Sequence, residues 1–442
     1  MKIRKYLILS LTIIALAVLL SGSAMTQSTK VAPQDQLSKA MKSAIIEKVV
    51  EIFDEYYPLP DVASDMIEYV REKYGKGEYS RFDSITDLTA QLTTDLRFVS
   101  NDLHIRISPY EKLPDDLAAE IKLGSPDDNY GFHKVERLPG NIGYLELTSF
   151  NNPRNAAPTA VAAMNFVAHC DALIIDLRLN GGGDEIMAQF LSSYFFEEST
   201  HLTDVYIRKD DKTEQVWSQE WVPGPKMTDI PIYILMSSFS YSSSEAFAYQ
   251  LQQLGRAVII GARTKGGAHA VRYMSFPELS VNMKVPYTRD INPYSKTNYI
   301  DGVIPDIETT AGAAFAMANI EACRKLLATE KNDDKRYELE WVLAGFLVEL
   351  NPVILEDAVL SEYVGLYDDV QFTLECRKLI YHWKDTTRHS LLPMGEDQFM
   401  YEEPDKAKYR VQFVRNDMGR VVEFYEHDRD GDSYPAKKRT GD

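Results

Sequence analysis

Hydrophobic residues recur every three or four positions in the first part of the chain after residue 36. The clearest run is made by Ile45, Ile46, Val49, Val50 and Phe53. This spacing is typical of a helix with one buried face. Two more helices are predicted over 62–74 and 85–98, with prolines 58 and 60 separating the first two. A strand pattern follows over 101–108, so residues 37–108 are predicted to form an N-terminal helical subdomain.

Apolar strand-like runs alternate with helical patterns between residues 129 and 325. Strands are predicted over 130–135, 142–147, 172–177, 232–236, 257–261 and 274–286, and helices over 157–169, 185–196 and 242–254. The alternation favours an α/β fold with parallel strands. The charged, proline-containing stretch 109–129 is predicted to connect this α/β catalytic domain, 129–325, to the helices before it.

Short alternating segments of apolar and polar residues fill the last part of the chain. They run over 370–374, 379–383, 390–394, 398–401, 409–415 and 421–425. Such a series is typical of an antiparallel sheet or a small barrel. We therefore predict a C-terminal antiparallel β domain, residues 355–442. The apolar helix Tyr337–Leu350 precedes it and is expected to pack on the α/β part.

The composition of the chain limits the molecules and metal ions that it is expected to bind. The 442 residues carry a net charge of −18, which argues against nucleic acid or an anionic membrane surface. Three cysteines stand far apart at 170, 323 and 376, so neither a cysteine zinc site nor a disulfide framework is expected. The acidic segment Asp428–Asp432 resembles part of a calcium loop but lacks the closing glutamate, and we interpret it as an acidic turn with no metal.

The N-terminus has the pattern of a secretory signal peptide, residues 1–24. A basic start is followed by an apolar run over 6–20 and by the small residues Gly22, Ser23 and Ala24. An uncleaved anchor helix is the alternative, although the run is short for a full membrane span. We expect a secreted or periplasmic protein with no membrane span after cleavage.

The segment Ser240–Tyr249 places Ser242 at the start of a helix that directly follows the apolar strand 231–236. A hydroxyl at this turn faces the positive end of the helix dipole, a position that suits a nucleophile for acyl transfer. Ser242 and Glu245 also have the spacing of a capping box, which usually only begins a helix. Both interpretations stay open on this segment alone.

Three loops follow strands of the α/β part, at the edge where ligands bind in such sheets. They are Asn180–Asp184, Ser237–Ser242 and Ala262–His269. The glycines at 181–183 could bring backbone N–H groups to a substrate carbonyl and form an oxyanion hole. A serine also needs a base, and the candidates are His104 with neighbouring Asp102, His269 and Lys265.

Several segments together resemble the tail-specific (C-terminal processing) protease family. The chain is most similar to the branch that includes the interphotoreceptor retinoid-binding protein repeats and the tricorn protease core. The similarity covers about residues 40–310. The matching segments are 96–107, 129–132, 140–150, 176–183, 240–249, 266–269, 291–293 and 302–306. The resemblance implies an α/β fold with a crotonase-like ββα spiral core.

The resemblance also implies roles for individual residues. Ser242, three residues before Glu245 of the same motif, would be the nucleophile, and His104 of the Asp-x-His segment would be the base. One oxyanion donor would come from Gly182 or Gly183 and the other from the Ser243 N–H. The lysine of the family's Ser/Lys members falls on Gly267, which disfavours that dyad.

Two features depart from the family pattern. The glutamate that the branch has before its Gly-Val-x-Pro-Asp turn is missing, so Asp301 or Asp102 would have to orient the base. The interval between Ile107 and Tyr130 is too short for an inserted PDZ domain.

We therefore expect a secreted serine peptidase acting on peptide or protein substrates, with no metal or organic cofactor. A non-catalytic binding protein for apolar ligands or peptides on the same fold is the alternative, because fold does not fix function. An esterase is a third hypothesis.

Overall fold

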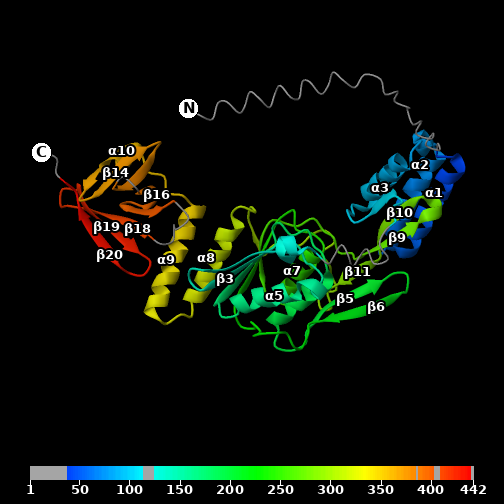
Figure 1. The fold of residues 1–442 in the computed structure, drawn as a ribbon, viewed down its shortest axis with the longest axis horizontal. Coiled ribbons are helices and arrows are strands. Elements are labelled where there is room, and N and C mark those ends of the chain that lie inside the picture. The colour runs from blue at the N-terminus through cyan, green and yellow to red at the C-terminus, as the bar shows by residue number, and fades with distance from the viewer. Residues whose placement is uncertain (1–36, 113–123, 385–386, 403–408, 440–442) are drawn as a thin grey trace, which may run out of the picture.

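The computed structural model describes residues 37–112, 124–384, 387–402 and 409–439. The predicted signal peptide lies outside the described residues. Three parts follow one another along the long axis of the molecule: N-terminal helices, a central α/β part and a C-terminal sheet (Figure 1). In the part of the chain that is described, no helix combines the length and hydrophobicity needed to cross a membrane.

The N-terminal part contains the three predicted helices, which are confirmed. They are α1 (Lys39–Tyr56), α2 (Pro60–Gly75) and α3 (Ile85–Ser100), with the short helix η1 (Glu78–Arg81) after α2. Ser38 and Ser84 begin α1 and α3 as side-chain caps, and Pro60 is the first residue of α2, where its missing N–H costs nothing.

The strand predicted from residue 101 begins later. Strand β1 covers only Arg106–Pro109, and it pairs with β10 (Val281–Pro286), which pairs with β9 (Val271–Phe276). Residues 101–105 instead form a turn that starts at Asn101 in a left-handed conformation. His104 therefore lies in a turn and not on a strand edge. Buried residues of β1 and β10 share one core with α1–α3, so strands from late in the sequence complete the N-terminal part.

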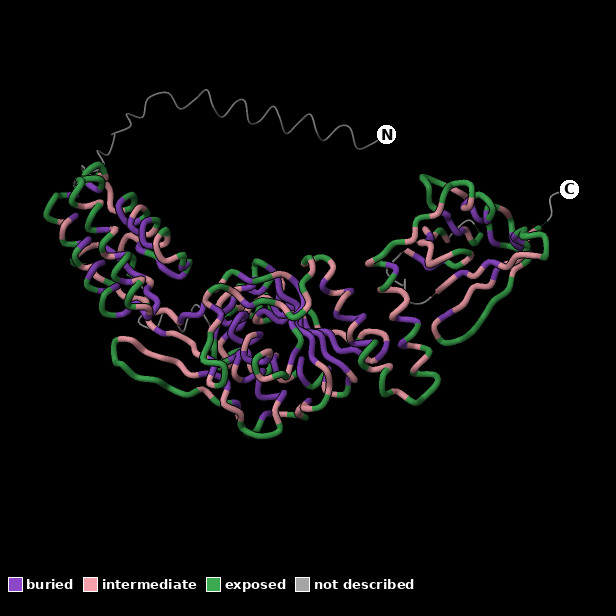
Figure 2. Tube along the Cα trace, turned by 180° about the vertical axis from the view of Figure 1, so that it is seen from behind, coloured by how far each residue is buried: buried purple, intermediate pink, exposed green. Residues whose placement is uncertain are grey.

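A six-stranded sheet forms the central part, in the order β12-β8-β7-β4-β3-β2. The strands are β2 (Phe132–Leu138), β3 (Ile142–Leu147), β4 (Ala172–Asp176), β7 (Ile232–Met236), β8 (Val258–Gly261) and β12 (Ile307–Glu308). All neighbouring pairs are parallel except β2 and β3. The middle strands are buried along their length (Figure 2), as expected for a sheet covered on both faces.

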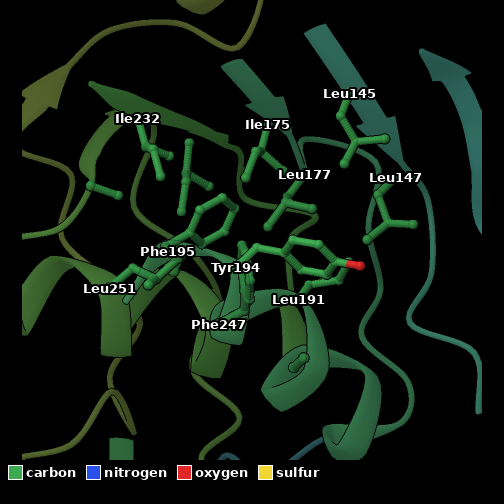
Figure 3. Close-up of a cluster of buried hydrophobic side chains, with 14 of the residues drawn as sticks. Leu145, Leu147, Ile175, Leu177, Leu191, Tyr194, Phe195, Ile232, Phe247 and Leu251 are labelled. Atoms are coloured by element: carbon green, nitrogen blue, oxygen red, sulfur yellow. The ribbon is translucent and has the colours of Figure 1, made fainter. Parts of the chain in front are cut away.

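Helices cover both faces of this sheet. One face packs on α5 (Pro153–Val167), α6 (Glu185–Ser192) with η3 (Ser193–Phe195), and α7 (Ser243–Gln253). Figure 3 shows strand residues such as Ile175 meeting helix residues such as Phe247 in that core. The other face packs on α8 (Ala314–Leu327) and α9 (Asp333–Leu350). The predicted packing of the linking helix on the α/β part is thus confirmed.

Several strands and short helices were not predicted from the sequence pattern. The hairpin β5 (His201–Ile207) and β6 (Lys212–Trp217) joins β11 (Thr288–Ile291) in a separate sheet. Most of β6 is exposed and polar, so it lacks the alternation that marks a half-buried strand. The short helices η2 (Pro126–Gly131) and η4 (Pro277–Leu279) were not predicted either.

The C-terminal part is an eight-stranded antiparallel sheet in which each strand pairs with the next. Its strands are β13 (Gly365–Tyr367), β14 (Val370–Glu375), β15 (Lys378–Trp383), β16 (Thr387–Gly395), β17 (Gln398–Tyr401), β18 (Tyr409–Arg415), β19 (Val421–Asp428) and β20 (Ser433–Lys437), preceded by α10 (Asp357–Glu362). An isolated bridge from Tyr367 to Lys438 brings the first strand near the chain after the last. The predicted fold class, an α/β core between helices and an antiparallel sheet, is confirmed.

Candidate active site

Ser242 occupies a strained turn between β7 and α7. Its backbone has φ 58° and ψ −125°, a left-handed conformation that costs a non-glycine residue roughly 1–3 kcal/mol. The Ser242 N–H donates to Oε2 of Glu245 at 2.8 Å, which helps to hold this conformation. The turn thus sets Ser242 at the positive end of α7, where developing negative charge is favoured.

Glu245 ties this turn to the loop that follows β8. Its side chain is fully buried, and Oε1 accepts hydrogen bonds from the Thr264 hydroxyl and from the Gly266 N–H, the latter at 2.7 Å. Burial raises the pKa of Glu245 to about 7, against the lowering effect of these hydrogen bonds. One carboxyl group therefore joins two of the three loops singled out in the sequence.

The glycine loop packs directly on the Ser242 turn. Asn180 organises it: its side-chain amide donates to the Leu147 carbonyl at 2.9 Å, and its Oδ1 accepts from the Gly182 N–H at 2.8 Å. A Cβ atom at Gly182 would lie only 2.8 Å from Cβ of Ser242. Only a residue without a side chain permits so close an approach.

The two predicted glycine donors differ in their availability. The Gly182 N–H is committed to Asn180. The hydrogen bonds between described residues give the Gly183 N–H no acceptor, and Ser243, as the first residue of α7, has an N–H with no acceptor inside the helix. Ser243 Oγ donates to the Gly183 carbonyl at 2.9 Å, which holds these two residues together. Gly183 and Ser243 are therefore the better pair to receive an oxyanion.

His104 and Asp102 lie together in the turn before β1, and both are buried. Asp102 Oδ1 is 3.1 Å from His104 Nδ1 and accepts the His104 backbone N–H at 2.9 Å. Burial alone would raise the pKa of Asp102, but the hydrogen bonds from His104 and the nearby imidazoles lower it. Asp102 can thus orient His104 as an ionised carboxylate.

Tyr241 connects the histidine to the serine turn. Its hydroxyl is 3.0 Å from His104 Nδ1, and the two rings lie 4.7 Å apart between centroids. Tyr241 directly precedes Ser242. The contacts between described residues include no hydrogen bond from Ser242 Oγ to His104. Such bonds are often long before substrate binds.

The remaining predicted residues lie elsewhere. Asp301 is exposed, its backbone oxygen accepts from Arg263 at 2.9 Å, and no contact between described residues joins it to His104. Lys265 is also exposed, with its ammonium 5.5 Å from the Phe239 ring. The structure brings Asp102, not Asp301, to the histidine.

Sequence reasoning missed Tyr57, and it singled out His269 only as a candidate base and not as a neighbour of Asp102. Tyr57, at the end of α1, donates its hydroxyl to Asp102 Oδ2 at 3.3 Å, and His269 Nε2 lies 3.9 Å from the same oxygen. Both contacts join segments far apart in the chain, so no local pattern predicts them. Tyr241 and Asn180 stood inside segments already singled out, and adjacency to Ser242 and to the glycines was the available signal.

Two family models match the chain. The model of peptidase family S41 matches residues 141–309, and the model of the N-terminal domain of peptidase S41 in eukaryotic IRBP matches residues 24–127. The first contains the serine turn and the glycine loop, and the second contains the Asp102–His104 pair.

Individual proteins are similar over shorter stretches. A carboxyl-terminal-processing protease of Picosynechococcus sp. is 24% identical over 184 residues, 40% of this chain and 41% of the relative. A tail-specific protease of Haemophilus influenzae is 32% identical over 115 residues, 24% of this chain and 15% of the relative. Among solved structures, the tricorn protease has a TM-score of 0.40 at 12% identity, covering 70% of this chain and 37% of that one. The chain thus spans less than half the length of these relatives.

Proposed function

The chain belongs to peptidase family S41, and we propose that it is a serine peptidase with Ser242 as its nucleophile. The observation that carries the proposal is the strained Ser242 turn, packed against a glycine loop and linked through Tyr241 to the Asp102–His104 pair. A residue that only caps a helix needs neither the left-handed backbone nor these neighbours.

The proposed reaction is acyl transfer. Ser242 Oγ attacks the peptide carbonyl carbon, and its proton passes to Nε2 of His104. Asp102 accepts a hydrogen bond from the Nδ1–H of His104 and, as a carboxylate, stabilises the imidazolium. The Gly183 and Ser243 N–H groups face the negative oxygen of the tetrahedral intermediate. The imidazolium then protonates the leaving amine, and water repeats the sequence on the acyl-enzyme.

A histidine base is supported by the space around Gly267. A Cβ atom at this position would lie 2.5 Å from Cε2 of Tyr241, so the phenol ring occupies the room that a side chain there would need. A lysine at this position would displace Tyr241 and its contact with His104. Lys265 offers no substitute, since it is exposed and lies over Phe239.

We further propose peptide or protein substrates and a secreted or periplasmic location. The names of the relatives, carboxyl-terminal-processing and tail-specific proteases, support the first, and the N-terminal sequence pattern supports the second. The net charge of −18 favours partners other than nucleic acid. The C-terminal sheet carries none of the proposed catalytic residues. We propose 37–108, 129–325 and 355–442 as domains, with strands β9 and β10 of the second range packed into the first.

Cleavage of a fluorescent peptide library tests the proposal. Wild-type protein should hydrolyse peptides, and Ser242→Ala should reduce turnover to background while its melting temperature stays within a few degrees of wild type. Ser238→Ala, which removes an exposed hydroxyl of the same loop, is the matched control and should keep wild-type rates. Binding of peptides without hydrolysis by wild type would instead support the non-catalytic alternative, and hydrolysis of esters alone would support an esterase.

A further inference from the structure

His269 is a second histidine on the carboxylate that orients the proposed base. It is 3% exposed, and its Nδ1 is 2.7 Å from the Thr288 carbonyl oxygen. A carbonyl oxygen only accepts, so Nδ1 carries the hydrogen and Nε2 of the neutral ring has a lone pair. That Nε2 is buried, has no hydrogen-bond partner among the described residues, and lies 3.9 Å from Asp102 Oδ2.

The surroundings of His269 contain groups of both charges. Asp102 faces it, and the Tyr57 ring lies 5.9 Å away, edge on. Arg289 on β11 and His104 in the turn before β1 act on it electrostatically. Neutral His269 thus presents a bare lone pair to a carboxylate. Addition of a proton would convert this unfavourable contact into an ion pair.

We propose that His269 is a positioning residue that controls whether Asp102 is available to His104. In its neutral form, His269 leaves the full charge of Asp102 to orient His104 and to stabilise its imidazolium. In its protonated form, His269 draws Asp102 Oδ2 toward Nε2 and neutralises the charge that His104 needs. This inference rests on the proposed function, because it takes His104 as the base.

Charge and geometry determine which form prevails. Burial lowers the pKa of His269, although the charge of Asp102 opposes this shift, so the neutral form prevails at neutral pH. Acidification would let Nε2 and Oδ2 close from 3.9 Å to about 2.8 Å, an ordinary charge-assisted bond. The two imidazoles compete for one carboxylate.

Two substitutions test the roles of the two ring nitrogens of His269 separately. His269→Asn keeps an amide near the Nδ1 position, within reach of Thr288, and removes the group that faces Asp102. His269→Gln places a permanent N–H donor near the Nε2 position. We expect His269→Gln to react with a fluorophosphonate about ten-fold more slowly than His269→Asn at pH 7.5, because the permanent donor withdraws Asp102 from His104.

The pH dependence gives a second readout. Below the pKa of His269, the wild-type labelling rate should fall more steeply with decreasing pH, changing from a dependence on one proton toward a dependence on two, because both imidazoles must then be neutral. The labelling rate of His269→Asn should depend on one proton throughout. His133→Asn, which changes an exposed histidine on β2, is the control and should keep the wild-type profile.

Nuclear magnetic resonance of labelled imidazoles tests the inference without catalysis. In Ser242→Ala protein, His269 should be protonated only on Nδ1 at pH 7.5 and should gain a proton on Nε2 at acidic pH. Adding Asp102→Asn should move that midpoint at least one pH unit lower, since the attracting charge is gone. An unchanged midpoint, or equal labelling rates for His269→Gln and His269→Asn, would overturn the inference. Absence of all labelling in wild type would overturn the proposed function. The resonance experiment would still test whether His269 gains its proton on Nε2 next to Asp102.

Discussion

Glu245→Gln should change the pH dependence of stability in a way that isolates one buried carboxyl group. Folding raises the pKa of Glu245 from its ordinary value of 4.5 to about 7. The stability from this group is therefore fully present below pH 4.5 and is lost as the pH rises through 7. At about 1.4 kcal/mol for each pKa unit, the loss amounts to about 3.5 kcal/mol. Glutamine stays neutral at every pH, so the variant should not show this loss of stability.

The expected result is a difference that grows with pH. Free energies of unfolding would be measured by urea titration between pH 4.5 and 8.5. From the acid end to the alkaline end, the difference between the two proteins should shift by about 3.5 kcal/mol in favour of the glutamine variant. The hydrogen bonds that glutamine cannot accept add a constant offset, which is the same at every pH. Glu278→Gln, an exposed glutamate outside the site, controls for the change in net charge.

The reactivity of Ser242 should fall in the Glu245→Gln variant. Glutamine has one acceptor oxygen, so it cannot receive both the Ser242 N–H and the pair of donors from Thr264 and Gly266. The strained Ser242 turn should relax, and fluorophosphonate labelling should fall at least ten-fold at pH 8. Unfolding free energies that run parallel for the two proteins at every pH would refute the reasoning about Glu245.

Three further predictions concern the base, the glycine loop and the C-terminal part. His104→Ala should abolish peptide hydrolysis in a folded protein, whereas Lys265→Ala should keep appreciable activity. The opposite pattern would show that the base is Lys265 and not His104. Gly183→Ala should lower the free energy of unfolding by more than ~2 kcal/mol and prevent labelling, since its Cβ would meet the Phe150 carbonyl oxygen at 2.0 Å, whereas Gly181→Ala should be tolerated because nothing lies closer than 3.9 Å. A chain ending at residue 356 should fold and label at the serine; a folded truncation that does not label would show that the C-terminal sheet shapes the site.

Most of the secondary structure was predictable because it follows local rules. The amphipathic spacing of α1 and the buried run of β4 are visible in short windows of sequence. The exposed strand β6 was not, because its residues are mostly in solvent and need no alternation. The pairing of β1 with β10 joins residues 172 or more positions apart, and no local window contains that contact.

The site was predictable to a similar extent. Ser242, the glycine loop and the Asp-x-His segment each lie in one short motif, so sequence and family resemblance could single them out. The partners of Asp102 come from three separate segments, and Tyr57 and His269 become neighbours only after folding. Asp301 was a candidate acid by its place in the chain, but it is exposed in the structure.

The most direct test of the account is the location of a covalent adduct. Wild-type protein would be treated with a fluorophosphonate, digested and mapped by tandem mass spectrometry. If Ser242 is the nucleophile and His104 its base, wild-type protein should carry a single adduct, on Ser242, that is absent from Ser242→Ala and strongly reduced in His104→Ala. An adduct on Ser240, Ser243 or Ser244, or no adduct on a folded protein, would contradict it.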